Sequence, residues 1–282
     1  MTPGEKATVL AEALPYIRHF WGKVVVVKYG GNAIGDDESL AGFAQDVALM
    51  RSVGMLTVVV HGGGPQIGDL MARLGKVPEF REGLRVTDAD TLDIARMVLV
   101  GKVNRDIVSA INVHGPLAVG LSGEDAGLIT ASARSPELGF VGDVESVNVS
   151  IVERLLAEEL IPVIATIGSD AEGQAYNINA DTAAGAIAEA LTAEKLVYLT
   201  NIEGLRKDVS DPGSLLSSVS VSDLDALVAD GSIVAGMIPK VASCVHAVRG
   251  GVGHAHILDG RTPHALLLEV FTHHGVGTMV SP

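Results

Sequence analysis

A lysine and two glycines follow an apolar run in VVVVKYGGNA, residues 24–33. The four β-branched residues predict a strand that is covered on both faces, as in a parallel sheet. Gly30 and Gly31 allow a sharp turn at the carboxyl end of this strand, where open α/β sheets bind ligands. Lys28 then places a cation beside backbone N–H groups that no Cβ shields, which is a way to hold a phosphate. The alternative interpretation is a strand, a surface lysine and a tight turn.

A second apolar run, MLTVVV at 55–60, also ends in glycines, in HGGGPQI at 61–67. Two glycine-ended strands of one sheet are less readily explained by chance than either alone, and they favour a shared binding site. The sequence GxxxxGK[ST] is absent, so the chain has no P-loop. Ile67 stands where a dinucleotide-binding fingerprint needs its third glycine. The glycines therefore predict a phosphate site of another kind.

Further polar residues in short motifs are candidates for the same site. Taken singly, each has a structural interpretation as a surface ion pair, a turn, a helix N-cap or an exposed helix residue. Taken together with the glycines, they favour a site for anions. They are Arg85 in GLRVTD, Asn177, Asn179 and Asp181 in YNINAD, and Lys240 in GMIPK.

Alternating strands and helices must position these residues. Thr2-Pro3-Gly4-Glu5 predicts a capped leading helix that bends near Pro15. The βα rhythm continues through the second half without a linker, which predicts two lobes of one continuous sheet. The remaining predicted helices cover 37–52, a segment capped by Thr87, about 90–114 and the Ala-rich stretch before 191; the predicted strands cover 117–121, 127–132, 139–147, 161–168 and the start of 195–205.

Composition limits the classes of function. The chain of 282 residues has a formal net charge of −14, which argues against nucleic-acid binding and requires an anion site to gather its cations locally. The apolar runs are shorter than the roughly 18 residues that span a membrane, and the N-terminus lacks a signal-peptide pattern, so we expect no membrane association and a cytoplasmic location. Cys244 is the one cysteine of the sequence, so an internal disulfide is excluded. The His254–His256 pair has no carboxylate or cysteine partner nearby that would favour a metal site.

The motifs resemble those of the amino-acid kinase family, in family order and over most of the chain. KxGG and the late lysine are shared by many of these kinases, whereas GLRVT with NxNAD is typical of the branch that acts on N-acetyl-L-glutamate. The resemblance implies a three-layer αβα sandwich around a mainly parallel open sheet, with an extra N-terminal helix. It implies one kinase domain over 1–282, made of an oligomerisation helix at 1–21, an acyl-substrate lobe at about 22–174 and an ATP-binding lobe with an effector region at about 175–282.

The implied activity is ATP-dependent phosphorylation of the side-chain carboxylate of N-acetyl-L-glutamate, on the way to arginine. A carboxylate with a pKa of ~4.3 is ionised at neutral pH, so the nucleophile needs no general base. The site must bring two anions together and neutralise the moving phosphoryl group. Mg²⁺ is expected to arrive with ATP and to be held mainly by its phosphates, without a metal site of the protein's own.

The resemblance also implies roles for single residues. Lys28 and Lys240 would contact the transferred phosphoryl group, and Asp181 would orient both lysines. Gly30 and Gly31 would donate N–H groups to the ATP phosphates. The acyl substrate would be bound by Gly62, Gly63, Arg85, Asn177 and Asn179. Asn201 and Arg206 differ from the residues that are frequent in the family at these positions, so the adenine contacts are left unassigned. Glu124 stands where a lysine is frequent, and it is given no role.

The C-terminal segment 253–280 and LPYIRHF in the N-terminal helix resemble the arginine-sensitive branch of these kinases. In that branch, neighbouring dimers interlace their helices into a hexamer that is a trimer of dimers, and L-arginine inhibits. The matching effector residues are Tyr16, His256, Glu269 and Gly275, each of which also has a plain packing or surface interpretation. The sequence leaves open whether a signalling protein is a partner.

Two other functions remain possible from the sequence. A sister kinase for a carrier-bound aminoadipate or glutamate would keep both lysines and change the pocket around Arg85 and Asn177. A non-catalytic arginine-binding regulator would have a broken phosphoryl site, whereas Lys28, Asp181 and Lys240 are all present.

Overall fold

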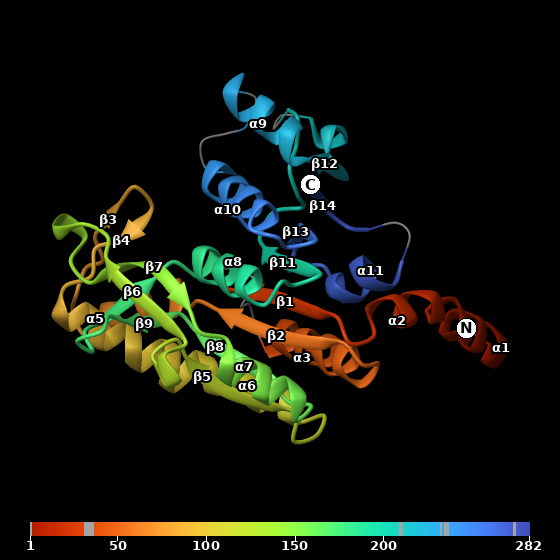
Figure 1. The fold of residues 1–282 in the computed structure, drawn as a ribbon, viewed down its shortest axis with the longest axis horizontal. Coiled ribbons are helices and arrows are strands. Elements are labelled where there is room, and N and C mark those ends of the chain that lie inside the picture. Colours follow the sequence, from red (N-terminus) through yellow and green to blue (C-terminus); the bar gives the residue numbers. More distant parts are fainter. Residues whose placement is uncertain (1, 31–36, 209–210, 232, 234–236, 273–274) are drawn as a thin grey trace.

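The computed structural model describes residues 2–30, 37–208, 211–231, 233, 237–272 and 275–282. A mainly parallel sheet of eight strands runs through both halves of the chain, with helices on both of its faces (Figure 1). The expected three-layer arrangement of helices around one mainly parallel sheet is therefore confirmed. In spatial order the strands are β12 (Ser218–Ser220), β14 (Thr278–Ser281), β13 (His254–Asp259), β11 (Lys195–Thr200), β1 (Val24–Tyr29), β2 (Leu56–His61), β8 (Ile161–Ala165) and β5 (Ala118–Ser122).

The valine run forms the middle of this sheet. β1 pairs in parallel with β2 on one side and with β11 on the other. Val25 and Val27 pack into the hydrophobic core on one face, and Val26 packs into the core on the opposite face. A strand that is covered on both faces needs apolar residues at every position, which explains four consecutive valines.

Helices form the two outer layers. One face is covered by α3 (Asp37–Ser52), α5 (Ala89–Arg96), α6 (Asn104–Asn112) and α11 (Ala265–Phe271), and the other by α7 (Ser150–Ala157), α8 (Ala180–Ala190), α9 (Val221–Ala229) and α10 (Ile238–Arg249). The helix α4 (Gly64–Arg73) follows β2. Cys244 of α10 is fully buried. No helix among the described residues is long and apolar enough to cross a membrane.

The N-terminal segment forms two short helices, α1 (Pro3–Glu12) and α2 (Leu14–Phe20), at the edge of the molecule (Figure 1). Thr2 and Glu5 make the predicted capping box of α1. The chain bends at Ala13, close to the predicted position at Pro15. Because α2 packs against α11, the N-terminal segment contacts the C-terminal part of the chain.

One local prediction, the helix cap at Thr87, was wrong. The helix after the hairpin of β3 (Phe80–Arg81) and β4 (Leu84–Arg85) is capped by Asp88, whose carboxylate accepts from Thr91 N, and not by Thr87. The helices predicted over about 90–114 are present as α5 and α6, and a π-helical segment at Met97–Val103 joins them. Such insertions occur often at functional sites.

The run at 161–168 was also predicted wrongly as one strand. It forms β8 of the large sheet and then β9 (Ile167–Ser169), which belongs to a small closed barrel with β6 (Ile129–Ala133), β7 (Val141–Val147) and β10 (Ala175–Ile178). The chain passes from one sheet to the other at Thr166, which is buried. This transition brings the barrel beside the carboxyl ends of β1 and β2, where the candidate site lies.

Candidate active site

Three charged residues from distant parts of the chain meet at the carboxyl end of β1. Lys28 Nζ lies 2.9 Å from Asp181 Oδ1, and Lys240 Nζ donates to Asp181 Oδ2, also at 2.9 Å. Lys28 is on β1, while Asp181 and Lys240 are in the first turns of α8 and α10. Helix N-termini favour anions, so two of them beside two ammonium groups form an electropositive centre on an acidic protein.

Asp181 stays ionised in this centre. Burial by itself raises the pKa of its carboxyl group, but the charges of Lys28 and Lys240 outweigh burial and hold the pKa below its usual value. Each carboxylate oxygen faces a different lysine. Asp181 therefore fixes the position of both cations while leaving the cluster with a net positive charge.

The two glycine segments lie against each other beside Lys28. A Cβ on Gly30 would lie 3.2 Å from Gly62 N and from Lys28 Cε, so this close approach depends on glycine. A Cβ on Gly62 would lie 3.2 Å from the Cβ of Ala180, at the start of α8. Gly31 lies outside the described residues. The predicted convergence of two glycine-ended strands is thus present at Gly30 and Gly62.

A pocket of about 210 Å³ opens beside Lys28 and contains the predicted acyl-substrate residues Gly62, Gly63, Arg85, Asn177 and Asn179. Arg85 Nη2 donates to Gly64 O at 2.8 Å, and its guanidinium lies 4.8 Å from the centre of the Phe80 ring. Burial lowers the pKa of Arg85.

The two asparagines of this pocket come from different elements. Asn177, on β10, donates to Thr87 Oγ1 at 3.4 Å. Asn179 is the N-cap of α8, and its Oδ1 accepts from the N–H groups of Asp181 and Thr182. The structural interpretation of Asn179 as a cap is therefore correct, and the same residue also lines the pocket.

A separate cavity of about 320 Å³ follows the carboxyl end of β11. Asn201, Ile202, Gly204 and Leu205 line one part of it, and Met237 lines another. Met237 directly precedes α10, the helix that carries Lys240. One wall of this cavity therefore lies close to Lys240 along the chain. Another wall is the turn around Asn201, whose contacts with adenine the sequence left unassigned.

A second buried charged cluster joins β11, β13 and α11. His256 Nε2 lies 3.0 Å from Lys195 Nζ, and His256 Nδ1 lies 2.8 Å from Glu269 Oε1. Burial lowers the pKa of His256 and also that of Lys195, although Glu269 opposes both shifts. His256 is therefore a neutral bridge between an ammonium group and a carboxylate.

Three of the four predicted effector residues contribute to this region directly. A Cβ on Gly275 would lie 2.6 Å from Glu269 Oε2, which places Gly275 against Glu269. Tyr16 is on α2, which packs against α11, the helix that carries Glu269. Lys195 was missed in the sequence, since a lysine at the start of an apolar strand has no motif around it.

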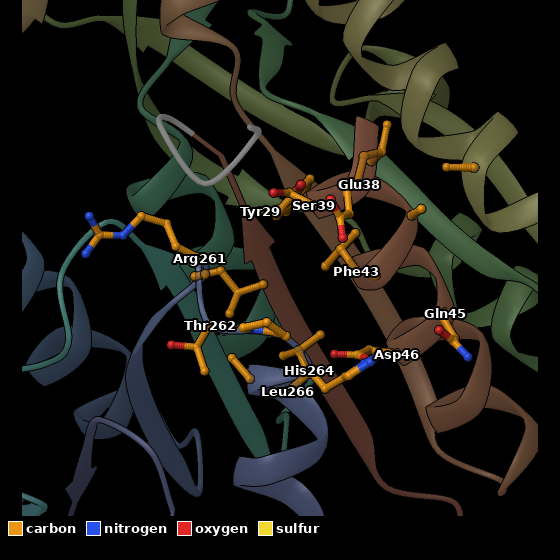
Figure 2. A pocket seen from close by; sticks show the side chains of 18 of the residues that line it. Tyr29, Glu38, Ser39, Phe43, Gln45, Asp46, Arg261, Thr262, His264 and Leu266 are labelled. Atoms are coloured by element: carbon orange, nitrogen blue, oxygen red, sulfur yellow. The ribbon is translucent and has the colours of Figure 1, made fainter. Parts of the chain in front are cut away.

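A larger cavity of about 780 Å³ lies beyond these sites, between α3 and the segment before α11 (Figure 2). None of the predicted site residues lines it. Figure 2 shows Asp46 and His264 facing each other there, and Asp46 Oδ1 lies 2.5 Å from His264 Nδ1. Burial raises the pKa of Asp46, against the effect of His264. Cavity size therefore does not identify the site that the charged residues define.

Comparison with known proteins agrees with this geometry. The profile of the amino acid kinase family matches residues 23–259. An acetylglutamate kinase of Symbiobacterium thermophilum is 55% identical over 98% of this chain and 97% of its own length. The chain belongs to the amino acid kinase family. It is a kinase, and its sequence is similar to that of acetylglutamate kinases over almost its whole length.

Two solved structures of N-acetylglutamate synthase from Neisseria gonorrhoeae are also similar. One is complexed with coenzyme A and N-acetyl-glutamate (TM-score 0.86, 28% identity), and the other with coenzyme A and L-arginine (TM-score 0.82, 27% identity). Both likenesses cover 98% of this chain, which spans only 63% and 65% of the respective synthase chains.

Proposed function

We propose that the protein transfers the terminal phosphoryl group of ATP to the side-chain carboxylate of N-acetyl-L-glutamate, as a step toward arginine. The observation that carries the proposal is the ion-paired arrangement of Lys28, Asp181 and Lys240 beside a pocket that contains Arg85. Kinases of this family use ATP, and the high identity to acetylglutamate kinases supports the acyl substrate.

The reaction would need positioning and charge neutralisation more than proton transfer. The substrate carboxylate is ionised at neutral pH and attacks without a general base. Lys28 and Lys240 would share the charge that spreads over the transferred phosphoryl oxygens, and Asp181 would keep both ammonium groups in place. Arg85 can form a paired hydrogen bond to the α-carboxylate of the substrate.

The nucleotide would lie with its phosphates at Lys28, Gly30 and Lys240 and its base in the cavity next to Met237. Mg²⁺ would be delivered as the complex with ATP. Both Asp181 oxygens already face lysines, so this carboxylate is engaged without a metal. The phosphates and water are the natural ligands of Mg²⁺ in such a site.

The test is acyl-phosphate formation trapped with hydroxylamine, with N-acetyl-L-glutamate, L-glutamate and L-aspartate supplied separately. Turnover confined to the acetylated substrate supports the proposal. If the folded protein turns over none of the three substrates, the proposal is contradicted. That result would favour a kinase for a carrier-bound substrate or a non-catalytic arginine-binding regulator. A comparison of N-acetyl-L-glutamate in wild type and Arg85→Lys separates paired recognition from simple charge, and the KM should rise in the variant because lysine cannot form the paired contact.

We further propose that L-arginine inhibits the enzyme at the cluster of Lys195, His256 and Glu269. Glu269 can pair with a guanidinium, and the contact of α2 with α11 would couple the ligand to the N-terminal segment. The likeness to a synthase crystallised with L-arginine supports this assignment.

The inhibition is tested by measuring the arginine concentration for half inhibition in wild type and in Glu269→Gln. We expect a large increase in the variant with little change in uninhibited turnover. Equal sensitivity in the two proteins would remove Glu269 from the effector site. A hexameric assembly and a cytoplasmic location remain predictions from the sequence.

A further inference from the structure

His61, the last residue of β2, is fully buried and has a partner on each ring nitrogen. His61 Nδ1 lies 3.0 Å from Gly62 O, and Nε2 lies 3.0 Å from Asn104 Nδ2. A carbonyl oxygen only accepts and an amide nitrogen only donates, so the two contacts assign the proton to Nδ1. Burial lowers the pKa of His61 to about 4, with the charge of Arg105 acting in the same direction and the bond to Gly62 against it. The imidazole is thus neutral at physiological pH.

Asn104 is held in one orientation by its surroundings. Its amide nitrogen also lies 2.8 Å from Val163 O on β8 and 3.3 Å from Leu121 O on β5, so its two hydrogens are shared among three acceptors. Arg105 donates to its Oδ1. The side chain therefore presents N–H, and not oxygen, to the imidazole.

The same region shapes the glycine segment by packing. Asn104 begins α6 directly after the π-helical segment, and Leu99 and Val103 of that segment contact Gly63. A Cβ on Gly63 would lie 2.8 Å from Leu99 Cδ2 and 3.1 Å from Val103 Cγ2. Gly120 on β5 leaves space for the amide of Asn104, because a Cβ there would overlap Asn104 Oδ1.

The hydrogen bond from His61 has a directional consequence. In a trans peptide, the C=O of one residue and the N–H of the next point in opposite directions. Because Gly62 O is turned toward the imidazole, the N–H of Gly63 is turned away from it. Within the described part of the chain, no hydrogen bond uses this N–H as a donor. Gly62 and Gly63 both line the pocket of about 210 Å³ that contains Arg85.

We propose that His61 and Asn104 are positioning residues that aim the Gly63 N–H at an anionic oxygen of the reacting carboxylate or phosphoryl group. The proposal rests on the function proposed above for this pocket. His61 acts through the Gly62–Gly63 peptide and does not touch the substrate. A fixed N–H donor at this point stabilises the charge that develops in the transition state without reorganisation.

The side-chain chemistry allows a matched pair of variants at His61. In His61→Asn, the amide nitrogen occupies nearly the place of Nδ1 and can still donate to Gly62 O, while Asn104 keeps both backbone acceptors. In His61→Leu, a side chain of similar width has no donor. We expect kcat to fall roughly 10²-fold in His61→Leu, with a smaller change in KM, and to be largely recovered in His61→Asn.

Asn104→Leu is compared with Asn112→Leu, which removes a similar set of bonds from the same helix. Asn112 joins α6 to Leu117 and Ala118, away from the pocket. Both variants should lower the melting temperature, but only Asn104→Leu should lower kcat. Equal kcat in these two folded variants, or equal loss in His61→Leu and His61→Asn, overturns the inference.

The Gly63 amide resonance in ¹⁵N–¹H spectra of the protein without substrate provides a readout that does not need turnover. We expect it to shift in His61→Leu and to return toward the wild-type position in His61→Asn. A resonance that is unmoved in His61→Leu overturns the inference even if the wild type proves inactive on N-acetyl-L-glutamate, an outcome that would contradict the proposed function separately.

Discussion

Asp181 forms an ion pair with each of the two lysines of the candidate site. Lys28 and Lys240 come from elements far apart in the sequence, and each approaches its own oxygen of this carboxylate. The side chain of Asp181 is only 18% exposed, so water replaces little of this interaction. Loss of the negative charge would release two cations at once and leave them close together in a poorly solvated site.

Asp181→Asn should therefore lose turnover and stability together. We expect kcat to fall by about 10²-fold or more, because both phosphoryl contacts lose their fixed position. The free energy of unfolding should fall by roughly 3–5 kcal/mol, as when one partner of a buried ion pair is removed in other proteins. Trapped acyl phosphate and denaturant titration measure the two effects.

Asp143→Asn is the control, since Asp143 pairs with Arg134 on the exposed surface. Asp143→Asn should change neither kcat nor the free energy of unfolding by much. A folded Asp181→Asn protein with wild-type kcat would contradict the role proposed for this carboxylate.

The contact of Asp88 with Lys76 leads us to predict that stability depends on pH. The hydrogen bond from Lys76, with those from Thr91, lowers the pKa of Asp88 to about 2 from its ordinary 3.8. A carboxylate with a depressed folded pKa contributes stability above its unfolded pKa and loses it as the pH falls through the folded value. In Asp88→Asn, which keeps the N-cap, the stability deficit should be full above pH 4 and shrink toward pH 2, as measured by urea unfolding. A deficit that is independent of pH would contradict this assignment.

At the start of α8, one side chain both caps the helix and lines the pocket. The Oδ1 of Asn179 accepts two backbone N–H groups, and among the described residues no hydrogen bond uses its Nδ2. Oδ1 therefore serves the cap, and the substrate contact proposed for this side chain falls to Nδ2.

Asn179→Asp should separate these two roles. Aspartate caps a helix as well as asparagine, so the melting temperature should change little. Its extra negative charge in an anion pocket should raise the KM for the acyl substrate at least tenfold, a loss of about 1.4 kcal/mol in binding. Asn179→Ala should lose about 1 kcal/mol of stability as well. An unchanged KM in Asn179→Asp would show that the amide does not face the substrate.

The strand that carries Lys28 and the helix that begins beside Asp181 were predictable because their motifs adjoin strong strand or helix patterns, whereas no element was predicted around Lys240. The change of sheet at Thr166 was not predictable, since an unbroken apolar run contains no mark of where its pairing partner changes. The π-helical segment was equally hidden, because its residues fit an ordinary helix. Thr87 was preferred over Asp88 as the cap, although both types cap helices and only the backbone decides between them. Lys195 and His61 required the packed structure, because their partners come from other strands.

The N-terminal helix α1 presents apolar side chains to solvent. Val9 and Leu10 are 53% and 75% exposed, and Leu14 at the start of α2 is 55% exposed. Exposed apolar side chains grouped in one place favour contact with another chain. This grouping agrees with the assembly expected from the sequence.

Leu10→Ser should reduce the molar mass of the assembly, as measured by light scattering during gel filtration, because a polar side chain removes apolar contact area. Leu74→Ser is the matched control, since Leu74 is also exposed, at 61%, but lies after α4. Turnover without arginine should be retained in both variants. An unchanged mass in Leu10→Ser would remove α1 from the interface.

The strand order also affects how the protein is made. β1 at the centre of the sheet pairs with β11, so that Val25 lies beside Lys195. During translation one edge of the valine strand stays open until β11 leaves the ribosome, a delay of roughly 10–30 s at usual elongation rates. An open apolar edge invites pairing between chains. Nascent chains and fragments that end before β11 should therefore depend on chaperones, and a stalled ribosome would release an aggregation-prone half rather than a folded lobe.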